Sequence, residues 1–246
     1  MNNIKAFLGR GTLAGVIGGV AAALFQWLVT EGQIRKALAI EAARAAGQVH
    51  DEMFSRTTQV LGGMAAAVLY GVFLGLVFAV VAAVLWATLP GRKAFHKSIR
   101  LATVGYVAWV LVPGLKYPAN PPAVGSVDTV ASRTTTFLGL IVASIIVAYL
   151  AWELWQRIGP NEHNPGRRFA IVAGVYLSAI AVIYVVLPSN QDPLDAPADL
   201  IWHFRLDSLA GNALLWLTMG TVFGILGDRI APSQRRATRN VALPFR

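Results

Sequence analysis

The stretch that decides the fold is residues 55–89, which read SRTTQVLGGMAAAVLYGVFLGLVFAVVAAVLWATL. It opens on a polar tetrapeptide with an arginine, and residues 60–89 then carry no charged side chain. A helix needs roughly 20 apolar residues to cross the hydrocarbon core of a bilayer. The stretch therefore predicts a transmembrane helix with one arginine at its mouth.

Composition extends this prediction to the whole chain. Of its 246 residues 56% are hydrophobic and 13% are charged, whereas soluble domains carry about 25% charged residues. We predict an all-α polytopic membrane protein in which residues 1–246 form a single transmembrane domain. Six predicted transmembrane helices account for most of it: 7–29, 60–89, 98–113, 135–157, 169–187 and 208–228.

The charge distribution predicts an orientation. The net charge is +9, and most of the 21 basic residues fall on one side if the N-terminus is cytoplasmic, as the positive-inside rule requires. Both termini are then cytoplasmic. The basic tail at 231–246 is expected to bind anionic lipid headgroups, with a partner protein as the alternative, and the distribution argues against nucleic acid.

The arginine motif recurs. SRTT at 55–58 returns at 132–135, and a looser version, FRLDS, stands at 204–208. Because an ionised side chain at a membrane boundary must find water, a partner or a pore, three equivalent arginines predict three outward helical hairpins, a pseudo-repeat, around a shared polar region. The three are Arg56, Arg133 and Arg205.

Three connectors join the helices of these hairpins on the outer side. The first, within 31–57, has apolar residues at helical spacing and predicts an amphipathic helix along the outer surface. The second, 112–122, and the third, 188–197, are broken by prolines, and we expect them to fold inward over the bundle. Three side chains of the second are candidates for a pathway or gate: Lys116, Tyr117 and Asn120.

A polar stripe leads from the arginines toward the membrane interior. Arg205, Ser208 and Asn212 fall on one face of the sixth predicted helix. One interpretation is a ring of donors that controls access, and the other is arginines that tie loops to helix ends or snorkel to phosphates. For cation transport the arginines should be paired, so we expect acids, Asp207 among them, to neutralise them across hairpins and lock the outer face.

Histidines and carboxylates could form a metal site beside these motifs. His50, Asp51 and Glu52 precede the first arginine, and His203 and Asp207 take a comparable place near the third. Imidazole and carboxylate suit cobalt, nickel or zinc, so a ring of the two groups could capture a hydrated cation. The alternative is a solvated turn with an ordinary histidine. The chain has no cysteine, which excludes thiolate ligands and disulfides.

Three stretches make the chain resemble the actinobacterial branch of the CbtA family, the predicted cobalt transporter subunits. They are LKYPANPPAVG at 115–125, FSRTT at 54–58 and WHFRLDSL at 202–209. The resemblance implies a multi-pass protein of the bacterial plasma (inner) membrane that serves cobalt supply for cobalamin synthesis. It also implies a small one-helix partner with a histidine-rich end, CbtB, and it leaves an oligomer possible.

The chain departs from this family in one respect. Many relatives have a histidine-rich first outer connector, whereas here that segment is rich in alanine and keeps only His50, Asp51 and Glu52. The resemblance then points to the partner as a source of imidazoles. Relatives are also often predicted with five helices, one fewer than we predict.

We therefore predict a transporter subunit for cobalt or a related divalent cation, with uptake driven by the membrane potential. The potential is worth about 2.3 kcal/mol per charge per 100 mV, so no ATPase domain is needed. The alternative is a structural or assembly subunit of a membrane complex. A membrane enzyme ranks below both, because it needs clustered acids and those here are scattered. We predict no catalytic residues and no cofactor other than transported Co²⁺.

Overall fold

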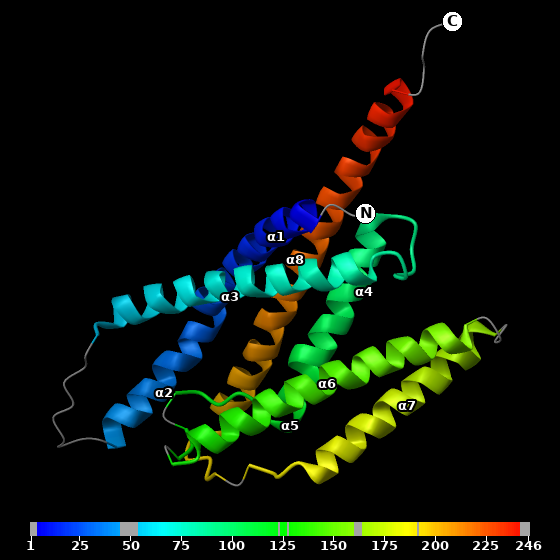
Figure 1. Cartoon of the computed structure of the whole chain (residues 1–246). Helices are drawn as coiled ribbons and strands as arrows, with labels where there is room; N and C mark the ends of the chain where they lie inside the picture. Colours follow the sequence, from blue (N-terminus) through cyan, green and yellow to red (C-terminus); the bar gives the residue numbers. More distant parts are fainter. Residues whose placement is uncertain are drawn as a thin grey trace, which may run out of the picture. The chain divides into compact units, whose positions relative to one another are not determined.

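The computed structural model describes residues 4–44, 54–122, 124–126, 128–159, 164–190 and 192–241, with side chains as far as residue 229. Within these ranges it contains helices and loops and no strand, which confirms the all-α class (Figure 1). In chain order the helices are α1 (Ile4–Phe25), the π-helical turn η1 (Gln26–Thr30), α2 (Glu31–Arg44), α3 (Arg56–Leu85), α4 (Ala94–Tyr106), the π-helical turn η2 (Val107–Leu111), α5 (Val112–Lys116), α6 (Val130–Ile158), α7 (Pro165–Val186) and α8 (Ala198–Val241).

Within the described residues, six helical stretches are long and apolar enough to cross a membrane, as the sequence predicted, so the chain is a multi-pass membrane protein. In two of them π-helical turns continue one helix into the next, as from α1 through η1 into α2. The surface position expected for the first connector stays a prediction. The six stretches are Ile4–Arg44, Arg56–Leu85, Ala94–Lys116, Val130–Ile158, Pro165–Val186 and Ala198–Arg229.

Polar residues set where two of these helices begin. Ser55 caps α3, because its Oγ accepts a hydrogen bond from the backbone N–H of Thr58 at 3.3 Å. Asn164 caps α7 in the same way, with its Oδ1 2.9 Å from the N atom of Gly166, and Pro165 follows at the first helical position, where a missing N–H costs nothing. Local sequence therefore places these helix starts.

Contacts divide the chain into two compact units. Unit 1 comprises Met1–Glu31, Gln48–Thr103 and Ala210–Arg246, and unit 2 comprises Gly32–Gly47 and Val104–Leu209.

In unit 1, α1 and α3 cross at a stripe of glycines. A Cβ added to Gly71 would lie 2.6 Å from the Cα of Gly19 and would also clash with the carbonyl oxygen of Gly15. Only glycine lets the two backbones approach this closely, so the glycines that stand four residues apart on each helix form the packing surface.

The core of unit 1 is aromatic. Phe223 of α8 packs on Phe7 of α1 and Phe78 of α3, with ring centroids 5.9 and 5.1 Å away. The guanidinium carbon of Arg10 lies 4.3 Å from the ring centroid of Phe7, a cation–π contact. Ser98 of α4 is fully buried and donates to a carbonyl oxygen of α8. These contacts join α1, α3, α4 and α8.

In unit 2, α6 and α7 run side by side (Figure 1). Leu140 of α6 and Ile180 of α7 form a buried cluster with Val112 at the start of α5. The hydroxyl of Tyr184 on α7 donates to the carbonyl oxygen of Val112, so the end of α7 holds α5 in place. Two loops follow from this region, and they carry the candidate site.

Candidate functional site

The three arginines of the recurring motif are all bonded, each to a different kind of partner. In unit 1, Arg56 opens α3 and binds Glu31 with two hydrogen bonds, Nη2 to Oε2 at 2.6 Å and Nε to Oε1 at 3.2 Å. The Glu31 side chain is 7% exposed and that of Arg56 is 35% exposed. Nη1 of Arg56 also donates to Gln59, one turn along the same face of α3. The carboxylate, and not the arginine, is the buried member of the pair.

The second arginine lies in unit 2, in the first turn of α6. Nε of Arg133 lies 3.2 Å from Oδ2 of Asp192, in the loop that joins α7 to α8. Its Nη2 donates to the carbonyl oxygen of Ser126 at 3.1 Å. Asp192 is again the buried member, with its side chain 7% exposed against 27% for Arg133.

The third arginine, Arg205 on α8, is also in unit 2 and binds no acid among the described residues. Its Nη2 donates to Oδ1 of Asn120 at 2.9 Å, and its Nε lies 3.4 Å from the carbonyl oxygen of Ala119. The expected pairing with Asp207 is wrong, because residues two apart on a helix point to different sides. An amide replaces the acid that we expected.

Two loops of unit 2 are therefore joined reciprocally. The 117–129 loop ends in the helix of Arg133, which binds the 187–197 loop at Asp192. The 187–197 loop ends in the helix of Arg205, which binds the 117–129 loop at Asn120. We call the contacts of Arg133 and Arg205 the two-loop clasp.

Two candidates of the second connector, Lys116 and Tyr117, form hydrogen bonds at or just after the end of α7. The hydroxyl of Tyr117 donates to the carbonyl oxygen of Pro188 at 2.6 Å, and Nζ of Lys116 donates to the carbonyl oxygen of Tyr184 at 2.7 Å. Burial raises the pKa of Tyr117 above its ordinary value, which keeps its hydroxyl a donor. The Tyr117 bond holds the 117–129 loop against the start of the 187–197 loop, and the Lys116 bond joins the end of α5 to α7.

The predicted metal ligands are only partly within the described residues. His203 is exposed on α8, and Oδ2 of Asp207, four residues on, is buried without a hydrogen-bond partner. His50, Asp51 and Glu52 lie outside the described residues. Across the described part of the chain, no three histidine or acidic side chains come close enough to hold a metal ion. The five-residue metal site stays a prediction.

The polar stripe is visible at one helix start. Arg56 and Gln59 are three residues apart and bonded to each other, so a short polar stripe also lies on one face of α3. Ser208 and Asn212 are half-buried on α8, and their place on a pathway stays a prediction. The recurrence of the motif as a structural repeat also stays a prediction, because its three arginines have three different partners.

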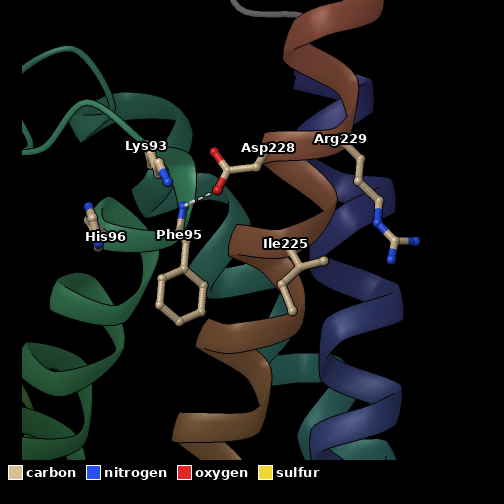
Figure 2. A pocket seen from close by; sticks show the side chains of 6 residues that line it. All are labelled: Lys93, Phe95, His96, Ile225, Asp228 and Arg229. Atoms are coloured by element: carbon tan, nitrogen blue, oxygen red, sulfur yellow. Dashed lines mark hydrogen bonds between the residues drawn. The ribbon is translucent and has the colours of Figure 1, made fainter.

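A shallow pocket of about 520 Å³ in unit 1 lies where α4 begins beside α8 (Figure 2). Asp228 of α8 accepts hydrogen bonds from the backbone N–H groups of Ala94 at 2.7 Å and Phe95 at 3.3 Å, and so caps α4 from outside. The side chains of His96 and Arg229 point away on opposite sides (Figure 2). Because His96 and Arg229 point away from Asp228, which caps α4, we interpret the pocket as a helix junction.

Sequence reasoning missed two of the most buried acids, Glu31 and Asp192. Glu31 follows directly on the first apolar run, and Asp192 lies within a proline-broken loop. An acid immediately after a predicted transmembrane run is a signal that it must be paired, and this could have identified Glu31. No local signal identifies the partner of Asp192, which lies far along the chain.

Comparison with known proteins gives one match. The model of a family described as "Probable cobalt transporter subunit (CbtA)" matches residues 4–228, most of the chain. No protein with curated annotation and no solved structure matches.

Proposed function

The chain belongs to the CbtA family of probable cobalt transporter subunits, and from this premise we propose that it carries Co²⁺ or a related divalent cation into the cell. The family match, together with six helices able to cross a membrane, is the observation that carries the proposal. We place the protein in the bacterial plasma membrane with both termini in the cytoplasm, following the positive-inside distribution of its basic residues.

The membrane potential is the proposed driving force. Moving one charge inward yields about 2.3 kcal/mol per 100 mV, and a divalent cation gains roughly twice that. The remaining barrier is dehydration of the ion, which oxygen and nitrogen ligands along the path must offset. Such a path needs no catalytic residues.

The two-loop clasp serves as the outer gate in this proposal. Unpaired arginines at an outer mouth would repel a cation. Arg133 is paired with an acid, whereas Arg205 is held by an amide and a carbonyl and keeps its positive charge. Tyr117 bonds the two loops together at Pro188, and Lys116 joins the end of α5 to α7 beside them. The loops close the mouth while these bonds hold, and they part when an ion passes toward Ser208 and Asn212.

Metal capture is assigned to the histidine and acidic residues. His203 and Asp207 are four apart on α8 and therefore share a face, and the buried, unpartnered Oδ2 of Asp207 supports a ligand role because such atoms call for an ion or water. With His50, Asp51 and Glu52 they would form the entry site. We assign the further imidazoles to a CbtB-like, one-helix partner, and lipid attachment to the basic tail at 231–246.

One observation favours a second function, an assembly subunit that transports nothing. Arg133 and Arg205 each tie an apolar helix to a loop, and Arg56 ties α3 to the first residue of α2, which is what a purely structural role requires. This alternative predicts stable copurification with a larger membrane complex and no flux in proteoliposomes.

Cellular cobalt, measured by elemental analysis, tests the proposal in a strain that lacks other cobalt importers. The protein is expressed alone, with a CbtB-like partner, and as His50→Ala. His96→Ala is the matched control, because His96 is an exposed histidine outside the proposed entry site.

We expect uptake above the empty-vector level that depends on the partner. It should fall in His50→Ala and stay unchanged in His96→Ala. If correctly inserted protein did not raise the cellular content of cobalt, nickel or zinc under any condition, the transport proposal would fail and the assembly function would replace it.

A further inference from the structure

We propose that Asp192 is the carboxylate of a binding site for a hydrated divalent cation, and that Arg133 occupies this site as an exchangeable counter-ion in the ion-free protein. The proposal rests on the transport function proposed above, because it gives a transported ion its first fixed ligand. Neither residue was identified from the sequence as a metal ligand.

The Asp192 carboxylate is held in place without help from the arginine. Its Oδ2 accepts a short hydrogen bond from the Thr129 hydroxyl, at 2.6 Å, and a longer one from the backbone N–H of Ser126, at 3.4 Å. The backbone N–H of Asp192 is itself fixed by Oδ1 of Asn190, at 3.1 Å. The carboxylate would therefore keep its position if the arginine left.

Arg133 is held less specifically. Its Nε lies 3.2 Å from Oδ2 of Asp192, within ion-pair distance, but no aligned hydrogen bond forms there. Its directed bond goes instead to the carbonyl oxygen of Ser126. The Glu31 pair differs, because Arg56 grips that carboxylate with two directed bonds. Charge, more than geometry, keeps Arg133 beside Asp192, and another cation can supply charge.

The groups around the guanidinium are those that bind hard cations. The carbonyl oxygen of Ser126 and Oδ2 of Asp192 both contact Arg133, and the Thr129 hydroxyl adjoins the same carboxylate. Oxygen ligands of this kind suit divalent cations that keep part of their water shell. A single carboxylate also binds weakly enough for the ion to move on.

Glycine makes room for this exchange. Gly125 has a φ of +101°, and a Cβ at this position would lie 2.6 Å from Nη1 of Arg133 and 3.2 Å from Oδ2 of Asp192. The arginine side chain is 27% exposed and the acid 7%, so the guanidinium is the more accessible member of the pair. An arriving cation therefore meets the arginine first and must displace it.

Binding of radioactive Co²⁺ to the full chain in lipid nanodiscs, measured by equilibrium dialysis, tests the site. Arg133→Gln removes the competing charge, so it should bind Co²⁺ about three- to tenfold more tightly than the unaltered protein, the range expected for a partly exposed ion pair. Arg133→Gln with Asp192→Asn should lose that gain. Arg157→Gln is the matched control, because the Arg157 side chain is 80% exposed and lies 3.9 Å from Glu153.

A second measurement uses the unaltered protein, so it does not depend on whether a variant folds. Co²⁺ that displaces the guanidinium should increase the rate at which phenylglyoxal modifies Arg133, as mapped by mass spectrometry, and leave Arg157 unchanged. Equal Co²⁺ affinity with and without Asp192, or an Arg133 modification rate that Co²⁺ does not raise, would overturn the proposal. Because both measurements are made without transport, their failure is distinct from a failure of uptake.

Discussion

Arg205 donates from Nη2 to Oδ1 of Asn120 at 2.9 Å, and this bond is the counterpart of the one between Arg133 and Asp192. Arg133 on α6 holds the loop that precedes α8, and Arg205 on α8 holds the loop that precedes α6. The two loops therefore depend on each other, and loosening one is expected to loosen both.

Asn120→Ala removes the acceptor for Arg205 and leaves a partly buried guanidinium with one long contact. We expect the free energy of unfolding to fall by about 1 kcal/mol, and amide hydrogen exchange to increase in both the 117–129 and 187–197 loops. Arg157→Ala, which breaks an exposed pair, should change neither. Faster exchange confined to the 117–129 loop would show that the clasp is not reciprocal.

Gly125→Ala places a side chain where the backbone φ is +101° and where a Cβ meets Arg133. Strain of this kind costs about 1–3 kcal/mol, so we expect a lower thermal unfolding temperature and weaker attachment of Arg133. Gly139→Ala is the control, because that glycine lies inside α6 with nothing within 4 Å of an added Cβ. It should stabilise the helix by up to about 1 kcal/mol. Similar results for the two variants would contradict this account.

Gly71→Ala tests the crossing of α1 and α3. An added Cβ clashes with the backbone of α1, including the Cα of Gly19 at 2.6 Å, so the helices must separate, at a cost of about 1–3 kcal/mol. Unfolding in mixed detergent micelles measures the loss. Gly62→Ala, on the same helix but with open space around it, should not be destabilised. Equal stability of the two variants would remove glycine packing as the basis of the contact.

The pKa of Tyr117 predicts an alkaline limit for the loop contact. Burial raises this pKa in the folded protein above the ordinary value of 10, so the stability that it contributes is present in full below about pH 10 and is lost as pH rises further. Unfolding at pH 8 and pH 11 should show a smaller alkaline loss in Tyr117→Phe than in the unaltered protein. Tyr149→Phe, at a side chain that is 54% exposed, should keep the full loss.

The sequence predicted the fold class well because the relevant signals are local. Charge-free runs as long as 60–89 are typical of transmembrane helices. Caps such as Ser55 act on the helix that directly follows them. The family resemblance, which rests on short motifs, was confirmed by the match over residues 4–228.

The partners of the arginines could not be predicted in the same way. Arg205 has an acid two residues away in Asp207, yet it binds Asn120 instead, because helix geometry separates neighbours at that spacing. Asp192 looked like one of several acids in a proline-broken loop, and only the structure shows it buried beside Arg133.

By itself, then, the sequence determined that the chain is an all-α membrane protein with six long apolar helices and a CbtA-type set of motifs. Only the tertiary structure decided that the acids, Glu31 and Asp192, are buried and the arginines lie nearer to solvent. The physical reason is that hydrophobicity and helical period are properties of neighbouring residues. The pairing of charges depends on which loops fold over which helix ends.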